Sequence, residues 1–487
     1  MRIADLVVFL VYLTGINLFG LSFYRRNRSA ASFTLGNRDF PTWVVGMSVF
    51  ATFVSSISFL ALPGSAYRGN WNAFVFSLAI PLASWIAVKF FVPLYRDFGS
   101  PSAYAYLESR FGPWARIYAS TCYLLTQVMR IGTILYLLAL PLAALFGWPL
   151  GAVIAGTGLA VLLYSALGGI RAVIWTDALQ GLLLIGGALG CLLYLIIRMP
   201  GGAASAMTNA YAQGKFSLGS TALSLGESTV WVVLVYGLFI NLQNFGIDQN
   251  FVQRYMASGS DRQARAATLL GSWLYIPVSF LFFAIGTALY AFYSAQPGVL
   301  PVELQAPEMG DRVFPWFIVT ALPPGIGGLL IAAIFAAGMS TVSTSINSSA
   351  TVIHTDYILR FAGNGQTDRT AMRWLYLTSA VIGISGIGVG FAFIRVEDAL
   401  DAWWKLASVF SGGMLGLFLL GAFTKSIHVG GALAGVVLAF ALNLWMSLSA
   451  VLPDGAVPVS PFHTYLSIVF GTLAIFLTGF LVAVLRR

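Results

Sequence analysis

Charged residues are scarce in this sequence of 487 residues and make up only 9% of it. Soluble globular domains average about 25%. Hydrophobic residues make up 58%, which is more apolar surface than a water-soluble fold of this length could bury. The apolar residues also come in runs of about 20, the length that crosses a hydrocarbon core of about 30 Å. The composition therefore excludes a water-soluble fold and predicts an integral membrane protein.

Cysteine and histidine are also scarce. Cys122 and Cys191 both lie inside apolar runs, and the three histidines are isolated from one another in the sequence. Neither a disulfide framework nor a metal-ligand motif is indicated. No Gly-Lys-Ser/Thr phosphate loop occurs, which argues against direct coupling to ATP. The net charge of +9 comes from basic loops between apolar runs and is not a nucleic-acid signal.

The apolar runs lack the alternation of polar and apolar residues that a membrane barrel requires, so we expect an all-α membrane protein. The run at 4–23 is too long and too apolar for a cleavable signal and is predicted to be the first span. A short amphipathic helix is expected around Pro315–Phe317, in the loop at 294–316. We predict one transport domain over residues 1–487 with thirteen spans, at 4–23, 40–66, 72–95, 115–145, 149–166, 172–197, 228–255, 267–293, 317–358, 371–394, 402–424, 427–449 and 462–485.

Basic residues are unequally divided between the two sets of alternate loops. Seventeen Lys and Arg residues fall in one set and six in the other. Because basic loops stay in the cytoplasm, we expect the N-terminus outside and the C-terminus inside.

Two spans look interrupted near their middle. The span at 40–66 contains Ser55-Ser56-Ile57-Ser58, and the span at 228–255 contains Asn241-Leu242-Gln243-Asn244-Phe245-Gly246. Interrupted helices at matching positions of two inverted halves point to a central binding site, where unwound backbone offers free carbonyls to cations. The alternative is that both are ordinary patches of small residues that let helices pack closely.

The span at 317–358 carries a dense run of polar residues. Eight of the sixteen residues at 334–349 are Ser, Thr or Asn. Positions 337, 340, 341 and 344 fall on one helical stripe, because residues three and four apart share a face, and Ser343 sits beside it. Hydroxyl oxygens are hard, neutral ligands that suit a dehydrated alkali cation. The alternative is hydrogen bonding between helices.

Asp177 lies one to two turns inside the span at 172–197. A carboxylate at that depth costs several kcal/mol unless a partner compensates it. No basic residue lies one turn away in the sequence, and a cation beside the hydroxyl run would supply the charge. A salt bridge to a distant Arg is the alternative.

Arg130 lies deep in the span at 115–145. An intramembrane Arg is a functional candidate by default, and its planar fork suits a carboxylate. We therefore expect it to bind the acidic group of a solute. The alternative is a structural pair with Asp177 or a backbone carbonyl. Asp248 and Gln249, just before Arg254, belong either to an inner gate network or to a simple helix-end ion pair.

Several motifs together resemble the sodium/solute symporter family, and most closely its bacterial sodium/sialic acid symporters. The motifs are Gly36-Asn37-Arg38, Phe50–Phe59, Gly168–Asp177, Val252-Gln253-Arg254-Tyr255 and the hydroxyl run. The resemblance covers nearly the whole chain and implies thirteen helices on the inverted-repeat fold of the bacterial leucine transporter. It divides the chain into an extra N-terminal helix (4–23), a first core repeat (40–197), an inverted second repeat (228–424) and two C-terminal helices (427–485).

The resemblance also implies roles for individual residues. The main Na⁺ site would use the backbone carbonyls of Ala51, Val54 and Ala337 with the hydroxyls of Ser340 and Thr341. A second Na⁺ site would use Asp177, Ser340, Ser343 and Thr344. The substrate carboxylate would bind Arg130, with further substrate contacts from Ser55 and Ser58.

This sequence departs from the sialic acid branch at the substrate site. Phe53 stands where that branch has a small hydroxyl residue, and Ser77 and Ala73 replace a Gln and an aromatic residue. A bulky ring in place of a hydroxyl shrinks and dries the pocket, so a smaller carboxylate-bearing solute is an equal candidate. The runner-up is a neutral sugar or amino acid, with Arg130 merely structural.

The resemblance implies a monomeric, sodium-driven symporter that works by alternating access in the lipid bilayer. Rival classes lack their signatures. A membrane enzyme would need clustered carboxylates, His ligands or a nucleophile–base pair within the spans, and a channel would need a continuous polar stripe through several helices. A solute sensor would usually carry a signalling domain, and only Arg486 and Arg487 follow the last predicted span.

Overall fold

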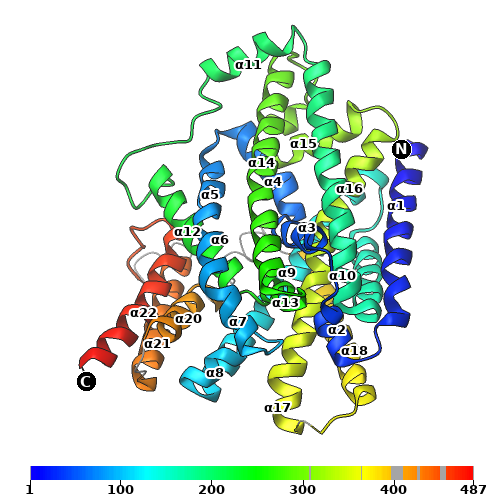
Figure 1. Cartoon of the computed structure of the whole chain (residues 1–487). Coiled ribbons are helices and arrows are strands. Elements are labelled where there is room, and N and C mark those ends of the chain that lie inside the picture. The colour runs from blue at the N-terminus through cyan, green and yellow to red at the C-terminus, as the bar shows by residue number, and fades with distance from the viewer. Residues whose placement is uncertain are drawn as a thin grey trace.

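The computed structural model describes residues 2–306, 309–363, 365–395, 410–424, 428–449 and 457–485. Every secondary-structure element in this part of the chain is a helix, and loops connect the helices (Figure 1). This confirms the predicted all-α class. The helices are α1 (Ile3–Leu21), α2 (Ala30–Leu35), α3 (Thr42–Phe53), α4 (Ser56–Arg68), α5 (Val75–Leu78), α6 (Ile80–Ile86), α7 (Val92–Phe98), α8 (Ala105–Phe111), α9 (Pro113–Phe146), α10 (Leu150–Ile197), α11 (Ala203–Ala212), α12 (Val230–Ile247), α13 (Gln249–Ala257), α14 (Asp261–Ser294), α15 (Gly310–Thr320), α16 (Ile326–Val352), α17 (Leu359–Ala362), α18 (Asp368–Phe393), α20 (Met414–Phe423), α21 (Val429–Leu448) and α22 (Ser467–Leu485).

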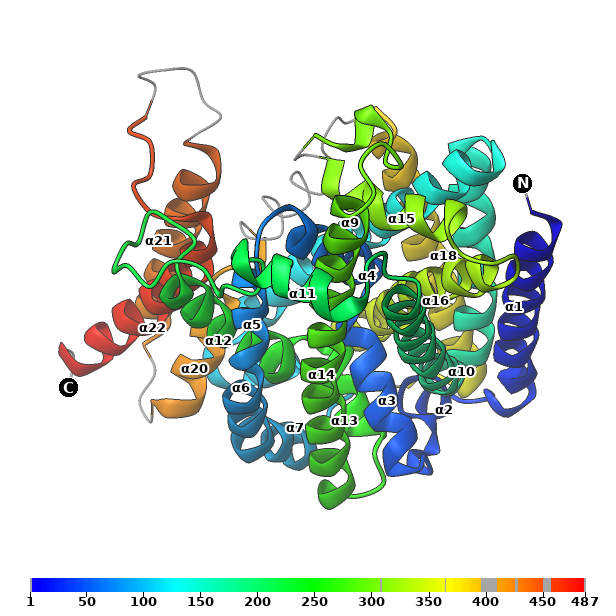
Figure 2. The ribbon, with the colours of Figure 1, turned by 90° about the horizontal axis from the view of Figure 1, so that it is seen from above.

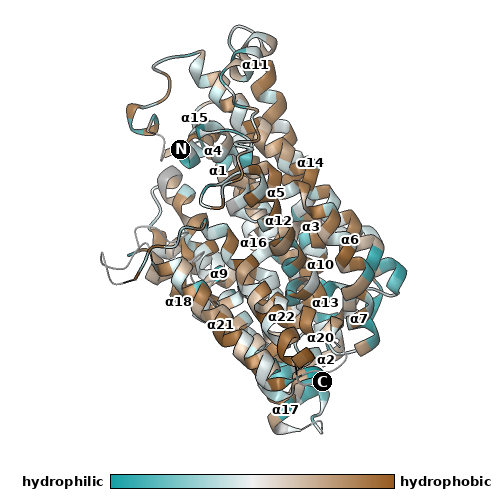
Figure 3. Ribbon diagram, turned by 90° about the vertical axis from the view of Figure 1, so that its left-hand side faces the viewer, coloured by the Kyte–Doolittle hydropathy of each residue, from teal (hydrophilic) through white to brown (hydrophobic). Residues whose placement is uncertain are grey.

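Ten helices in the described part of the chain are long and apolar enough to cross a membrane, or up to eleven when the bent pair α3 and α4 is taken as one span. Large apolar side chains such as Leu82, Trp85, Phe280 and Leu477 are about half exposed, as expected for a surface that faces acyl chains. Figure 3 shows apolar residues along α6, α14 and α20 to α22, with hydrophilic residues gathered towards the end that carries α17. The chain is therefore a multi-pass membrane protein.

The central element of the bundle is α16. Its apolar span is 89% buried, whereas the N-terminal span is only 22% buried. The helix packs against α1, α9, α10 and α18. Seen from above, α1 lies at one edge of the molecule and α20 to α22 lie at the opposite edge (Figure 2). The hydroxyl run of α16 therefore faces protein on all sides rather than lipid.

The predicted interruption of the span at 40–66 is confirmed. The backbone leaves the helical conformation at Val54 and Ser55, where ψ is 117° and 171°, and the two halves of the span are bent by 55°. The spans at 149–166 and 172–197 form one element, α10, which is kinked at Gly169 (φ 58°, ψ −160°). A positive φ of this kind is open to Gly and strained for other residues.

The interruption predicted at Asn241–Gly246 is wrong in position. These residues lie within α12, and the break falls at Asp248, whose ψ is 124°. The Asp248 carboxylate accepts a hydrogen bond of 2.7 Å from the backbone N–H of Asn250. It therefore acts as the N-cap that starts α13, a role in which Asp is strongly preferred.

The span predicted at 317–358 begins later than expected. The short helix expected near residue 315 is confirmed as α15, a separate element that ends at Thr320. Pro323 and Pro324 follow, and α16 starts only after Gly325, whose φ is 88°. Two prolines and a positive φ cannot continue a helix, so they separate the two elements. The first part of the span predicted at 402–424 lies outside the described residues.

The first helix is fastened to the start of α16 by Asp5. Its Oδ1 accepts hydrogen bonds from the backbone N–H groups of Gly325 (2.7 Å) and Gly328 (2.8 Å). Two of the free donors at the helix N-terminus are thereby satisfied by a negative charge, which the helix dipole also favours. Arg2 donates to the backbone carbonyl of Leu322 at the same end. The N-terminal helix thus fixes one end of the central helix.

We expect Asp5→Ala to lower the stability of the protein by about 1–2 kcal/mol, because it removes a cap and its charge. Asp5→Asn keeps an acceptor oxygen and should lose less. Unfolding of the purified protein in detergent measures both changes. Val7→Ala, at a half-exposed position of the same helix, is the control. An Asp5→Ala variant as stable as this control would contradict the capping role.

Candidate functional site

The first polar cluster lies where α3 ends against the middle of α16. The Ser340 hydroxyl donates to the backbone carbonyls of Ala51 (3.1 Å) and Ala337 (2.9 Å), and the Thr341 hydroxyl donates to Ala337 (3.1 Å). All four residues are at most 2% exposed. Val54 lies at the interruption directly after α3, where its own carbonyl is released from the helix. The structure thus brings oxygens of four predicted ligands of the main Na⁺ site together, those of Ala51, Ala337, Ser340 and Thr341.

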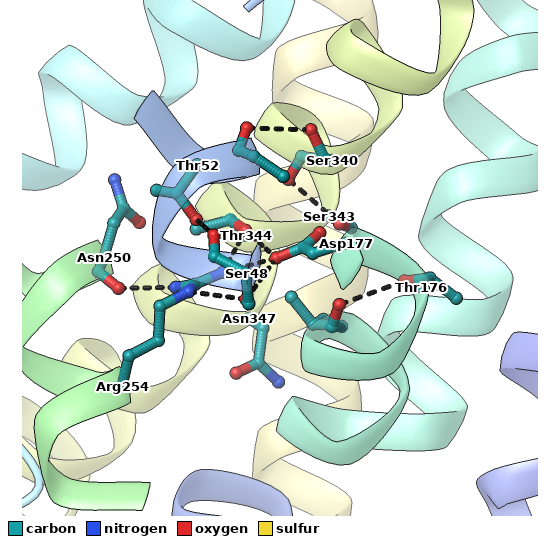
Figure 4. A network of polar contacts seen from close by, with 12 residues as sticks. Ser48, Thr52, Thr176, Asp177, Asn250, Arg254, Ser340, Ser343, Thr344 and Asn347 are labelled. Atoms are coloured by element: carbon teal, nitrogen blue, oxygen red, sulfur yellow. Dashed lines mark hydrogen bonds and ion pairs between the residues drawn. The ribbon is translucent and has the colours of Figure 1, made fainter. Parts of the chain in front are cut away.

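The second cluster surrounds Asp177, which is fully buried on α10 (Figure 4). Its Oδ2 accepts hydrogen bonds from Ser48 (2.7 Å), Thr344 (3.4 Å) and the guanidinium of Arg254 (2.6 Å). Among the predicted ligands, Thr344 bonds Asp177 directly, whereas the Ser343 hydroxyl donates to the backbone of Ser340 (3.1 Å). Within the described part of the chain, Oδ1 of Asp177 has no hydrogen-bond partner.

The alternative of a salt bridge between Asp177 and a distant Arg is therefore realised, and the partner is Arg254. Its side chain is 1% exposed, and it bonds Ser48 (2.8 Å), Thr344 (2.7 Å) and the carbonyl of Asn250 as well as Asp177. Arg254 and Asp177 are 77 residues apart, so spacing along the chain gave no indication of this pair. The signal available was the presence of a deep Asp and an Arg close to a helix break.

The remaining polar side chains of α13 also bond other elements. Gln249 donates to Pro101 (2.7 Å) and accepts from the backbone N–H of Ala103 (2.8 Å). Asn250 accepts from Tyr123 of α9 (2.9 Å). Gln253 donates to Asn347 and Thr351 of α16 (3.0 Å each) and to the carbonyl of Thr34. This short helix is therefore docked by polar contacts as well as by apolar packing.

A further ionic group ties α8 to one end of α9, to the helical turn Ile353–Ile358 that follows α16, and to α17. Glu108 accepts hydrogen bonds from Arg116 (2.7 Å) and from Arg360, and Arg116 also bonds Asp356 (2.6 Å). Burial acts to raise the pKa of Glu108, but the hydrogen bonds and charges of the two arginines outweigh it and hold the pKa below its ordinary value. This group lies on the outside of the polar interior and has no contact with Asp177.

Arg130 of α9 borders two cavities. The smaller, of about 140 Å³, is lined by the predicted residues Phe53 and Ser58 and also by Thr52, Phe76, Asn244, Phe251 and Tyr275. The larger, of about 330 Å³, shares Arg130 and Asn244 and includes Tyr123, Gln127, Gln243 and Asp248. No residue of the described chain lies within hydrogen-bonding or ion-pairing distance of the Arg130 guanidinium. The structural pair with Asp177 is thus not formed.

Phe53 stands at the centre of an aromatic cluster. Its ring stacks on Phe245 (centroids 5.3 Å apart) and meets Tyr275 edge to face (4.5 Å), and Phe76 and Phe251 lie 6.2 Å away. One side of the smaller cavity is therefore aromatic, while Thr52, Ser58, Arg130 and Asn244 make the rest of its lining polar. Two other predicted substrate residues do not line it, since Ser77 donates to Ser279 of α14 (2.8 Å) and Ser55 precedes α4 as its N-cap.

The sequence is similar to those of known membrane transporters. Residues 33–439 match the model of the sodium:solute symporter family. The sodium/sialic acid symporter SiaT of Proteus mirabilis is 34% identical over 88% of this chain and 86% of its own length. The sodium/sialic acid symporter NanT of Aliivibrio fischeri is 30% identical over 98% of this chain and 92% of its own length.

The fold is likewise shared with a solved structure. A Na⁺-coupled sialic acid symporter in a substrate-bound, outward-open state superposes with a TM-score of 0.89 at 31% identity, covering 99% of this chain and 98% of that one. The bent bundle and its polar centre are thus those of a membrane transporter. The chain belongs to the sodium:solute symporter family, and it couples the movement of sodium to that of a small organic solute.

Removing one member of the Asp177–Arg254 pair should lower the stability of the protein. We expect Asp177→Asn and Arg254→Gln each to lower stability by about 3–5 kcal/mol, because each leaves a buried charge without its counter-charge. The double variant should be more stable than the sum of the two losses predicts. Thermal unfolding of the four proteins in detergent tests this, and strictly additive losses would show that the two side chains do not interact.

Proposed function

We propose that this protein imports a small carboxylate-bearing solute together with Na⁺ by alternating access. The observation that carries the proposal is Arg130, a cation in the membrane interior with no acceptor among the described residues, which faces two adjoining cavities. Asp248 lines the larger cavity together with Arg130 but forms no direct ion pair with it, and an Arg at this depth without a hydrogen-bond acceptor is expensive. A solute carboxylate would supply the missing bidentate acceptor.

The lining of the smaller cavity supports a short acid with an apolar body. Its volume of about 140 Å³ equals roughly five water molecules at about 30 Å³ each. Aromatic rings from α3, α5, α13 and α14 form one side of its wall, and Thr52, Ser58, Arg130 and Asn244 form the polar remainder. Sialic acid, which the relatives are named for, carries more hydroxyls than these few polar residues could satisfy. A polar group of the solute would instead point into the larger cavity.

Two Na⁺ sites complete the proposal. The main site would use Ala51, Val54, Ala337, Ser340 and Thr341. Hydrogen bonds join four of these residues, and Val54 lies at the adjoining interruption after α3. The second would use Asp177, Ser340, Ser343 and Thr344, and the carboxylate oxygen of Asp177 without a partner supports it. Hydroxyls, backbone carbonyls and a carboxylate are the hard oxygen ligands that suit Na⁺. The main site also spans the two elements whose relative movement would open and close the solute cavity.

The wider architecture follows from the family. We propose thirteen transmembrane helices, with a core of two inverted repeats (40–197 and 228–424) between the extra helix 4–23 and the pair 427–485, acting as a monomer. Interruptions in α3–α4 and α12–α13 support the repeat. The termini lie at opposite ends of the molecule (Figure 1), which supports an external N-terminus and a cytoplasmic C-terminus in a bacterial inner membrane.

Reconstituted vesicles test the transport proposal. We expect uptake of short organic acids under an inward Na⁺ gradient and none under a K⁺ or H⁺ gradient. Arg130→Lys should lower the apparent affinity for the acid by roughly ten- to hundredfold, because the lost fork removes hydrogen bonds to a charged group. Arg110→Lys is the control, because Arg110 lines neither cavity in the described part of the chain and donates to backbone carbonyls at the end of α20. Equal uptake on every gradient would refute sodium coupling.

Phe53 tests the size and polarity of the solute. Phe53→Ser removes a ring that packs on the solute and should lower the affinity for short apolar acids about tenfold or more, while improving competition by sialic acid. Phe53→Leu keeps the wall apolar and should retain the preference. Competition against a radiolabelled short acid measures both. Wild-type uptake of sialic acid in preference to short acids would overturn the apolar assignment.

A further inference from the structure

Arg254 has no assigned part in sodium binding. Resting on the proposed second Na⁺ site, we infer that Arg254 is the positioning residue of that site: it holds one oxygen of the Asp177 carboxylate so that the other faces the cation. The ion does not contact Arg254 in this arrangement, and the residue acts through Asp177.

The hydrogen bonds of Asp177 are unevenly divided between its two oxygens. Ser48, Thr344 and Arg254 all donate to Oδ2, while Oδ1 is fully buried and has no donor in the described part of the chain. In the view of Figure 4, the free oxygen points away from Arg254, towards Ser343. A buried charged oxygen left without a partner is costly. The arrangement therefore leaves one anionic ligand directed at the hydroxyls of α16.

Arg254 is the element that prevents the carboxylate from turning. Its three nitrogens bond Ser48, the carbonyl of Asn250, and both Asp177 and Thr344. The guanidinium is thereby fixed by α3, α10, α13 and α16 at once. Rotation of the Asp177 carboxylate would break its bonds to Arg254 and Ser48 together. A Lys at this position could not reproduce the planar fork.

Removal of Arg254 should change the sodium affinity in opposite directions, depending on whether the residue acts through its charge or by positioning Asp177. If Arg254 acted only through its charge, it would repel a cation, and removing it would tighten sodium binding. If Arg254 positions Asp177, its removal frees the carboxylate to turn and weakens sodium binding even though a positive charge has been lost. Arg254→Lys keeps the positive charge and removes the planar fork that holds Asp177.

The inference also links the site to movement of α13. Arg254 reaches Asp177 only while α13 is docked through Gln249, Asn250 and Gln253. A positioned carboxylate and a docked α13 therefore occur together. By linkage, sodium at this site and docking of α13 must strengthen each other equally. Undocking of α13 would release the carboxylate, and with it the cation.

The experiment compares Arg254→Lys and Arg254→Gln with the wild type. Sodium alone is titrated into the purified, solute-free protein, with choline as the inert cation, and the thermal shift is followed. Uptake of a short acid in vesicles is then measured against sodium concentration. We expect both variants to need roughly tenfold more sodium for half-maximal effect and to lose the second sodium, so that the Hill coefficient falls from about 2 to about 1.

Ser48→Ala keeps both charges and removes one donor from Asp177 and one acceptor from Arg254, so it serves where an Arg254 variant does not fold. It should shift the sodium dependence in the same direction by a smaller factor. Arg171→Lys is the matched control, since Arg171 lies on α10 and pairs with the half-exposed Asp39 (2.5 Å). Its sodium dependence should equal that of the wild type.

Two results would overturn the inference. One is an Arg254→Lys protein with wild-type sodium dependence beside an Arg254→Gln protein that binds sodium more tightly, which would leave only a charge effect. The other is unchanged sodium binding in all three variants. A wild type that binds sodium but transports no organic acid would refute the proposed solute and leave the role of Arg254 intact, because the thermal titration contains no solute.

Discussion

The buried carboxylate of Asp177 is the group on which the polar interior of this bundle depends. A carboxylate removed from water must be hydrogen-bonded or paired, and here the partners come from three other helices: Ser48 of α3, Arg254 of α13 and Thr344 of α16. Satisfying one charge therefore fixes the relative positions of four helices. Two of these, α3 and α16, also supply the oxygens around Ser340, so the geometry of one polar cluster constrains the other.

The interrupted helices explain how such an interior is compatible with movement. At Val54 and at Asp248 the backbone leaves the helix, which frees polar groups only where they are enclosed by protein, as lipid demands. The half-helix α13 is held by side-chain hydrogen bonds, which are individually modest in net energy, and by buried apolar residues such as Phe251 and Val252. Under the proposed alternating access, such hydrogen bonds would be exchanged for bonds to water as α13 moves.

Features encoded within one short segment were predictable, and those that depend on distant pairs were not. Local composition predicts the hydroxyl run of α16 and the Ser-rich break after Val54. Arg130 is recognisable from its depth in an apolar run. The second break was predicted at the wrong position, because the Asn- and Gln-rich stretch before Phe245 is a more prominent sequence signal than the single N-cap residue Asp248. The partner of Asp177 depends on how α10 bends at Gly169 and how α13 docks. The aromatic wall around Phe53 is assembled from five separate helices, and no single-sequence pattern reports that convergence.

The proposed second Na⁺ site has an energetic consequence for transport. The charge moved in one cycle is set by the ions and the solute that cross the membrane, and two Na⁺ with one carboxylate would carry one net charge inward. With a tenfold Na⁺ gradient worth about 1.4 kcal/mol per ion and a potential of ~100 mV worth about 2.3 kcal/mol per charge, the available free energy is roughly 5 kcal/mol. That corresponds to accumulation of several thousandfold, whereas one Na⁺ with one carboxylate is electroneutral and sustains only about tenfold. The proposed second Na⁺ site would therefore distinguish a scavenger of scarce acids from a symporter that only follows the sodium gradient.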